Sequence, residues 1–187
     1  MTLDLRNRRV LVIGASSGIG EATAAAFAAA GAKTIATARA GAKLQDAASR
    51  MGAEAGPLDI LDGPGIEAFF ARQAPFDHVV ITAARTKTES VASLSLADAY
   101  AAMDSKFWGA YRIAKVARIE GGGSLTFVSG QMAVRSAPTS VLQGAINSAL
   151  QGLARGLASE LAPVRVNAVS PGLTATPLHA GLSEADR

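Results

Sequence analysis

Three closely spaced glycines have the pattern of a phosphate-binding turn. They lie in the segment Gly14-Ala15-Ser16-Ser17-Gly18-Ile19-Gly20, between a short apolar run and an alanine-rich segment. A glycine-rich turn from a strand into a helix lets main-chain N–H groups approach a diphosphate, and the helix N-terminus adds a partial positive charge. We expect Gly14 to allow the tight turn, Gly18 the close approach of the ligand and Gly20 close packing of the helix. Because a glycine motif alone is weak evidence, a purely structural turn is the alternative.

Short apolar runs alternate with longer alanine-rich segments along the chain. This alternation predicts the strands and helices that position the turn. The runs are rich in Val and Ile and mostly apolar on both faces, as are parallel strands covered by helices. The expected strands are residues 9–13, 33–37, 54–58, 78–82, 124–128 and 165–169, and the expected helices are 19–30, 42–51, 65–72, 95–117 and 139–161. We interpret Gly121-Gly122-Gly123 as the turn into the fifth strand. The predicted fold is α/β, a doubly wound parallel sheet of the Rossmann type in a single domain over residues 1–187.

Composition excludes several classes of protein. The 187 residues are 49% hydrophobic and 18% charged, which fits one compact domain and excludes a disordered chain. The chain has no cysteine, so disulfides and cysteine-ligated metals are excluded. His78 and His179 lack the spacing of a metal site and the setting of a hydrolase triad, so no metal is expected.

Charge and hydropathy do not indicate nucleic-acid or membrane binding. The pI of about 9.6 arises from a net charge of only +3, and the one tight basic cluster is Arg6, Arg8 and Arg9. Aromatic residues that would stack on bases are scarce. No apolar stretch approaches the ~20 residues that span a bilayer, and the first apolar run is too short for a signal peptide. We therefore expect a cytoplasmic protein.

Several segments together resemble the short-chain dehydrogenase/reductase family, in the family's order and over essentially the whole chain. Besides the glycine-rich turn, Leu58-Asp59-Ile60 matches the family's adenine-binding aspartate, and Ile81-Thr82-Ala83-Ala84-Arg85 is a degenerate form of its Asn-Asn-Ala-Gly stretch. The segment from Arg165 to Gly172 resembles its sixth strand and Pro-Gly turn, with Thr176 at the threonine that helps to hold nicotinamide. The resemblance implies a dinucleotide site formed by Gly14, Ser16, Ser17, Gly18, Ile19, Gly20, Arg39, Asp59, Ile60, Ala83, Pro171, Gly172 and Thr176.

The cofactor preference follows from the end of the second strand, Thr37-Ala38-Arg39. An acidic residue there would accept hydrogen bonds from the adenosine ribose and repel a 2′-phosphate. This chain has no carboxylate at that point, and the Arg39 guanidinium can pair with a phosphate, with Lys43 one turn into the next helix. NADP(H) is therefore favoured over NAD(H), although Arg39 as a solvated charge is the alternative.

At its four catalytic positions the chain departs from the family, which uses asparagine, serine, tyrosine and lysine. Aligned by its local surroundings, each position is altered: Lys106 stands at the asparagine, Gly130 at the serine, Gln143 at the tyrosine and Asn147 at the lysine. Ser129 lies one residue before the serine position. The catalytic residues are therefore unknown, with Lys106 and Ser129 as candidates.

Lysine and asparagine look exchanged between Lys106 and Asn147. One hypothesis is that these side chains converge from neighbouring helices and keep an ammonium near the nicotinamide ribose; coincidence on a variable surface is the other. Gln143 has no proton to give near neutral pH, whereas a desolvated lysine has one. The literal Tyr-x-x-x-Lys pair, Tyr111 and Lys115, precedes the fifth strand whereas the family pair follows it, so we assign Tyr111 to helix packing or surface.

Two functions remain open at this point. One is an oxidoreductase that transfers a hydride between NADP(H) and a small carbonyl or alcohol substrate with a non-standard proton donor. The other is a catalytically inert NADP(H)-binding sensor or partner subunit. Arg85, where the family has glycine, would bring a positive charge to an anionic ligand or crowd the nicotinamide end, unless it points to solvent.

The end of the chain also departs from the family pattern. Family members continue past the Pro-Gly turn through two helices and a last strand, whereas this sequence ends at Ser183-Glu184-Ala185-Asp186-Arg187, which we interpret as the start of a helix. We expect a truncated or partly ordered portion of a longer protein; the alternative is a sheet that lacks the C-terminal last strand. A homo-oligomer is expected from the resemblance.

Overall fold

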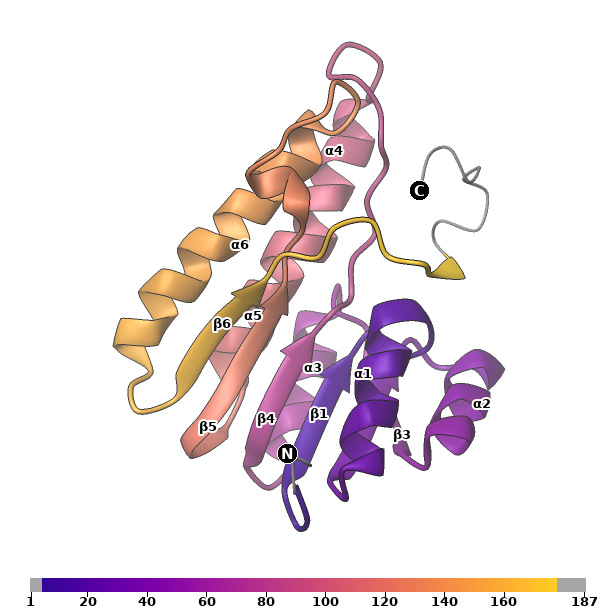
Figure 1. Cartoon of the computed structure of the whole chain (residues 1–187), viewed down its shortest axis with the longest axis vertical. Coiled ribbons are helices and arrows are strands. Elements are labelled where there is room, and N and C mark those ends of the chain that lie inside the picture. Colours follow the sequence, from indigo (N-terminus) through magenta and orange to yellow (C-terminus); the bar gives the residue numbers. More distant parts are fainter. Residues whose placement is uncertain (1–4, 178–187) are drawn as a thin grey trace.

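Six parallel strands form one sheet in the order β3-β2-β1-β4-β5-β6 (Figure 1). The computed structural model describes residues 5–177, so the helix start expected at 183–187 lies outside the described residues. The strands are β1 (Arg9–Ile13), β2 (Lys33–Ala38), β3 (Glu54–Pro57), β4 (Phe76–Ile81), β5 (Ile119–Val128) and β6 (Arg165–Val169). The expected doubly wound parallel α/β fold is confirmed.

Helices cover both faces of this sheet. They are α1 (Gly18–Ala29), α2 (Ala42–Met51), α3 (Gly63–Ala71), α4 (Leu96–Met103), α5 (Gly109–Val116) and α6 (Val141–Glu160), with a π-helical turn η1 (Asp104–Trp108) between α4 and α5 and a 3₁₀ turn η2 (Gln131–Ala133). Side chains alternate along β1: Val10 and Val12 pack with α1 and α2, whereas Leu11 and Ile13 pack with α3, α5 and α6. This alternation is the period-two pattern of a strand, and it produces two cores, one on each face.

Strand order places a crevice above the centre of the sheet. The chain runs outward from β1 to β2 and β3 in one direction and from β4 to β6 in the other, so the order reverses between β1 and β4. Connections that leave neighbouring strands in opposite directions leave a gap at the carboxyl ends of those strands, where open α/β sheets bind their ligands. The glycine-rich segment begins at the end of β1 and therefore lies at this point.

Two local expectations were wrong. Gly121-Gly122-Gly123 lies inside β5, which begins at Ile119, and not in a turn before it. Gly122 has φ +84°, a Cβ on Gly123 would collide with the Asp77 carbonyl of β4, and the register between β4 and β5 shifts nearby. The glycines therefore form an irregular stretch inside β5, and regular pairing with β4 and β6 begins at Ser124. The helix expected over 95–117 is interrupted by η1. The sequence did not reveal this interruption, because the apolar pattern of a π-helical turn differs little from that of an α-helix.

None of the helices in residues 5–177 is both long enough and apolar enough to cross a lipid bilayer. Within the same residues, His, Asp and Glu side chains form no group of three or more that would hold a metal ion.

Candidate active site

A cleft of about 540 Å³ lies at the carboxyl ends of β1, β2 and β4. Most residues that the sequence assigned to a dinucleotide site line it, namely Gly14, Ser16, Ser17, Gly18, Ile19, Gly20, Arg39, Asp59, Ile60, Ala83 and Thr176. Lys43, Thr82, Ala84, Arg85 and Ser105 also line it, whereas Pro171 and Gly172 do not. The structure thus brings together residues that are up to 162 positions apart, Gly14 and Thr176.

Backbone geometry at Gly14 admits no side chain. Its φ is +92°, and a Cβ there would lie 2.6 Å from both the Ala83 nitrogen and the Thr82 Oγ1. The Gly14 N–H donates to the Thr37 carbonyl of β2 at 2.7 Å, while the Thr82 hydroxyl donates to the Ile13 carbonyl at 2.9 Å. The turn is therefore held between β2 and β4, and the chain passes too close to β4 for any residue larger than glycine.

The N-terminus of α1 opens into the cleft. Ser17 is its N-cap residue, in extended backbone conformation, and makes no side-chain capping bond. The first main-chain bond of the helix runs from the Glu21 N–H to the Ser17 carbonyl at 3.3 Å. The preceding helical N–H groups have no partner within the helix, as at every helix N-terminus, and they carry the positive end of its dipole. This arrangement suits a diphosphate.

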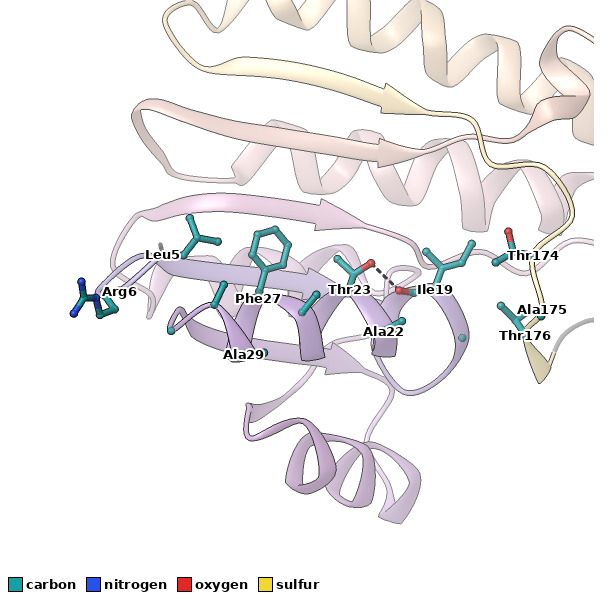
Figure 2. A pocket seen from close by; sticks show the side chains of 14 residues that line it. Leu5, Arg6, Ile19, Ala22, Thr23, Phe27, Ala29, Thr174, Ala175 and Thr176 are labelled. Carbon is teal, nitrogen blue, oxygen red and sulfur yellow. Dashed lines mark hydrogen bonds between the residues drawn. The ribbon is translucent and has the colours of Figure 1, made fainter. Parts of the chain in front are cut away.

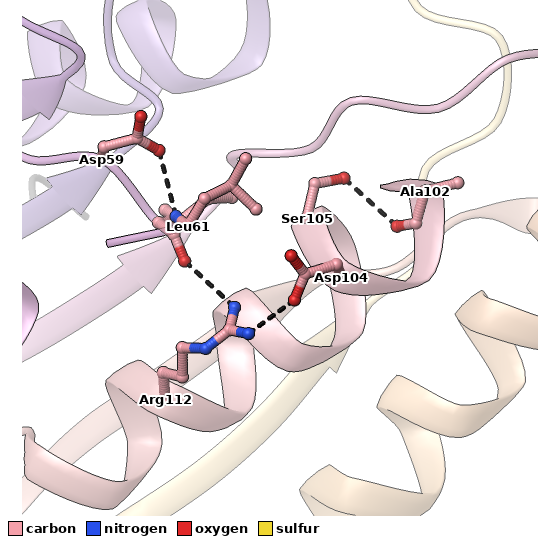
Figure 3. Close-up of polar contacts among 7 residues, drawn as sticks. Asp59, Leu61, Ala102, Asp104, Ser105 and Arg112 are labelled. Carbon is pink, nitrogen blue, oxygen red and sulfur yellow. Dashed lines mark hydrogen bonds and ion pairs between the residues drawn. The ribbon is translucent and has the colours of Figure 1, made fainter. Parts of the chain in front are cut away.

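Positive charge exceeds negative charge among the side chains that line the cleft. Arg39, Lys43 and Arg85 form no ion pair with any carboxylate of residues 5–177. The acidic residue of the lining is Asp59, whose Oδ1 accepts a hydrogen bond from the Leu61 N–H at 3.0 Å (Figure 3). The cleft is therefore electrostatically suited to an anionic ligand.

A polar network joins the turn after β3 to η1 (Figure 3). Arg112 of α5 donates to the Asp104 carboxylate at 2.5 Å and to the Ile60 carbonyl at 3.4 Å. Ile60 also packs on Gly109, where a Cβ would lie 3.1 Å from the Ile60 Cδ1. These contacts fix the π-helical turn relative to the cleft, and π-helical turns occur frequently at functional sites.

Lys106 projects from η1 toward the end of β5. Its ammonium donates a hydrogen bond to the Ser129 carbonyl at 3.0 Å. Burial lowers the pKa of Lys106 to about 8, because the charged form loses its hydration. Lys106 is not among the residues that line the 540 Å³ cleft, although its neighbour Ser105 is.

Ser129 and Asn147 meet beneath the same strand end. Ser129 is 4% exposed, and its hydroxyl donates to the main-chain carbonyl of Asn147 at 3.0 Å. Asn147 itself is 3% exposed, and its Oδ1 has no hydrogen-bond partner in the described part of the chain. Ser129 is therefore held from two elements: its carbonyl accepts from the Lys106 side chain of η1, and its hydroxyl donates to the Asn147 main chain of α6.

Gly130 and Gln143 flank this group. A Cβ on Gly130 would lie 2.7 Å from the Asn147 Nδ2, so the side chain at 147 occupies the space beside residue 130. Gln143 lies one turn before Asn147 on α6, and its amide nitrogen and oxygen are both buried with no partner among residues 5–177. A buried amide without partners is costly, at about 1–3 kcal/mol, so a ligand or water that hydrogen-bonds it would be stabilised there.

The segment after β6 returns across the cleft. Pro171 lies beside the end of β5, where its carbonyl accepts from the Gln131 N–H at 2.9 Å. A Cβ on Gly172 would lie 2.7 Å from the Gln131 Oε1. Thr176 reaches the turn after β1, and a Cβ on Gly18 would be 3.3 Å from the Thr176 Cβ. Pro171 and Gly172 therefore lie at the β5 end of the site, and Thr176 lies at its glycine-rich end.

A larger hollow of about 1220 Å³ follows α1 (Figure 2). It shares Gly18, Ile19 and Thr176 with the cleft, but most of its other lining residues are small or apolar, including Ala22, Ala26, Ala29, Ala30 and Phe27. Since it lacks the convergent charges and unpartnered donors of the smaller cleft, we place the active site in the 540 Å³ cleft.

Fold and cleft together define an α/β protein of the doubly wound class, with a cleft whose shape and charge suit a dinucleotide. A family model described as enoyl-(acyl carrier protein) reductase matches residues 14–187. A short-chain dehydrogenase/reductase of Stachybotrys chlorohalonatus is 32% identical over 203 residues, which cover 97% of this chain and 79% of that protein. The chain belongs to the short-chain dehydrogenase/reductase family, and its relatives support an oxidoreductase enzyme.

Other similar proteins carry more specific names. D-erythrulose reductase of Gallus gallus is 32% identical over 182 residues, covering 93% of this chain and 74% of that protein. Among solved structures, a short-chain dehydrogenase/reductase of Brucella melitensis has a TM-score of 0.93 at 28% identity, covering 99% of this chain and 80% of its own. A short-chain dehydrogenase of Burkholderia cenocepacia in complex with NADP has a TM-score of 0.87 at 28% identity, covering 93% of this chain and 77% of its own.

Some site features had no signal in the sequence. Ser105, 2% exposed, accepts from the Arg85 N–H at 3.0 Å and donates to the Arg85 carbonyl at 2.8 Å, so it fixes the loop after β4. A serine within an apparently continuous helix gives no indication of this role. The Arg112–Asp104 pair is eight residues apart, a spacing that predicts no contact on a regular helix.

A double-mutant cycle tests the contact between Gly130 and Asn147. We expect Gly130→Ala to lower the free energy of unfolding by about 1–3 kcal/mol, because its Cβ would press on the buried Asn147 amide. In an Asn147→Ala background the same change should cost less, because the amide is gone. Urea denaturation measures all four proteins; equal costs of Gly130→Ala in both backgrounds would contradict the contact.

Proposed function

We propose that the protein is an NADP(H)-dependent oxidoreductase that interconverts a small carbonyl compound and its alcohol. The observation that carries the proposal is the cleft at the ends of β1, β2 and β4, where a turn that admits only glycine meets an open helix N-terminus and unpaired cations. When bound, the dinucleotide supplies or accepts the hydride; the chain must hold it, orient the substrate and move a proton.

Residues of the cleft suit the parts of such a ligand. The segment from Gly14 to Gly20 would hold the diphosphate with main-chain N–H groups, and Asp59 and Ile60 would contact the adenine end. Arg39 and Lys43 at the end of β2 would bind a 2′-phosphate, which NAD(H) lacks. Ala83 and Thr176 would contact the nicotinamide end, while Pro171 and Gly172 would support the neighbouring loop.

Replacing Arg39 tests the proposed cofactor preference. We expect Arg39→Ala to raise the Kd for NADPH about tenfold, because a charge-assisted hydrogen bond to phosphate is lost, and to change the Kd for NADH little. Titration calorimetry with both dinucleotides measures the effect. Arg155→Ala, an exposed arginine on α6, is the matched control. Equal weakening of NADPH and NADH would contradict a 2′-phosphate site at Arg39.

Lys106 is the proposed proton donor. Of the side chains that converge on the end of β5, it is the one that has a titratable proton to transfer, and burial brings its pKa to about 8. A general acid is most effective when its pKa is near the working pH. In carbonyl reduction, the Lys106 ammonium would give its proton to the carbonyl oxygen as negative charge develops there; in alcohol oxidation, the neutral amine would take that proton back.

Ser129, Asn147 and Gln143 would position these groups. The Ser129 hydroxyl is committed to the Asn147 carbonyl, so Ser129 would act through its own carbonyl, which anchors the Lys106 amine. The Gln143 amide transfers no proton near neutral pH, but its unpartnered N–H can donate a hydrogen bond to the substrate oxygen. We therefore assign Ser129 and Asn147 to positioning, and Gln143 to orientation of the substrate.

Removal of the Lys106 amine tests its role. We expect Lys106→Met to lower kcat/KM for carbonyl reduction by about 10²–10⁴-fold, the usual contribution of a general acid. In the unsubstituted protein, reduction should decline as the pH rises through about 8, because the ammonium is lost, whereas alcohol oxidation should rise over the same range. Steady-state kinetics from pH 6 to 10 measure both directions.

Two further variants separate proton transfer from structure. Lys106→Arg keeps the charge but remains protonated, so the break near pH 8 should disappear. Lys115→Met, an exposed lysine on α5, should leave both rate and profile unchanged. An unchanged rate in Lys106→Met would remove Lys106 from catalysis. Dinucleotide binding without turnover of any carbonyl in the unsubstituted protein would instead favour an inert binding protein.

The chain also offers a surface for self-association, and we propose a homo-oligomer. Leu96, Tyr100, Trp108 and Tyr111 are 44–71% exposed along the continuous α4–η1–α5 segment, and the Trp108 and Tyr111 rings are 5.7 Å apart. Clustered apolar exposure of this kind is typical of interaction surfaces. Sedimentation should give at least twice the monomer mass, and Trp108→Ser with Tyr111→Ser should reduce it; a monomeric unsubstituted protein would contradict the proposal.

A further inference from the structure

We propose that the substrate carries an anionic group, a carboxylate or phosphate, and that Arg85 binds it. This inference rests on the proposed carbonyl reductase function and adds the class of substrate. Arg85 is exposed, lines the 540 Å³ cleft and makes no side-chain hydrogen bond or ion pair with any of residues 5–177. An exposed arginine that lines a cleft and whose guanidinium has no partner among these residues is suited to a bidentate bond with a carboxylate or phosphate.

Sheet register separates Arg85 from the proposed cofactor phosphates. Ile13 of β1 is paired with Thr37 of β2 on one side and with Ile81 of β4 on the other. Arg39 follows Thr37 by two residues and Arg85 follows Ile81 by four, so the two guanidiniums belong to strand ends on opposite sides of the glycine-rich turn. Strands two positions apart in a sheet are about 10 Å apart.

Neighbouring strands place Arg85 at the end of the cleft that lies toward the proposed proton donor, Lys106. Ile81 is paired with Phe127 of β5, and Ser129, which anchors Lys106, follows Phe127 by two residues. A dinucleotide with its 2′-phosphate at Arg39 and its diphosphate at the turn would extend toward β4 and β5. The anion that remains for Arg85 is then one that the substrate brings.

Hydrogen bonds fix the main chain of Arg85, so the loop holds this charged residue in a defined place at the cleft. The buried Ser105 hydroxyl bonds both the N–H and the carbonyl of Arg85, at 3.0 and 2.8 Å. Ser105 immediately precedes Lys106 in η1, so one turn of helix holds the loop that carries Arg85 and the proposed proton donor. The nearby acid, Asp98, is bonded by Lys87 at 2.7 Å and by Ser95 at 2.9 Å, and it forms no ion pair with Arg85.

Paired substrates test the inference. The probes are 2-, 3- and 4-oxo acids and, as controls, the methyl ester of each, which keeps the carbonyl and removes the charge. The unsubstituted protein should reduce at least one acid with a kcat/KM about tenfold or more above that of its ester. Arg85→Met should lower kcat/KM for that acid by about 10–100-fold, the range of a charge-assisted hydrogen bond, with the ester and the Kd for NADPH nearly unchanged.

Two further variants accompany Arg85→Met, one as a control outside the cleft and one that keeps the positive charge. Arg72→Met, an exposed arginine after α3 and outside the cleft, should have no effect, and Arg85→Lys should retain part of the preference. Equal losses for acid and ester, a weaker Kd for NADPH in Arg85→Met, or reduction of esters and neutral ketones alone would overturn this inference and leave the oxidoreductase proposal standing. Absence of turnover with every carbonyl would overturn both.

Discussion

Close approach of the main chain at the end of β1 is the constraint on which the site depends. At Gly14 the chain turns with φ +92° while it is bonded to Thr37 of β2 and packed within contact distance of Ala83 after β4. That passage is possible only without a side chain, and it aims the start of α1 at the point where the strand order reverses. The cleft, the helix dipole and the cations are all arranged around this turn, so the main chain alone already forms a surface that suits an anion.

A second constraint acts at the end of β5, where polar groups are buried together. Lys106, Gln143 and Asn147 would each be more stable with further partners: burial lowers the pKa of the amine, and three amide atoms lack a hydrogen bond among the described residues. Functional sites commonly retain such unfavourable local arrangements, because a group that is already desolvated and fixed in place reacts or binds with less reorganisation. We interpret the incomplete hydrogen bonding as a site prepared for a polar substrate.

Sequence alone predicted most of the fold, because burial on both faces makes the strands nearly continuous apolar runs. The strands at 9–13 and 165–169 and the helix at 42–51 have the predicted limits. It did not predict η1, since the hydrophobic pattern around Asp104 to Trp108 fits either kind of helix. Nor did it predict that Gly121 to Gly123 form an irregular stretch inside β5, between the paired residues Ile119 and Ser124. Cleft residues could be predicted where the backbone conformation requires one residue type, as at Gly14, where only glycine fits. Ser105 was missed, because its role depends on a tertiary contact with Arg85.

The central claim is that main-chain amides after β1 hold a diphosphate, and amide-resolved NMR with NADPH tests it most directly. Titration into the ¹⁵N-labelled protein should shift the amide resonances of Ser17, Gly18 and Gly20 saturably, whereas that of Ala29, at the far end of α1, should change little. Inorganic diphosphate alone should affect the same amides more weakly. If these resonances do not move at a dinucleotide concentration that saturates shifts elsewhere, or if nothing moves at all, the amides after β1 hold no diphosphate.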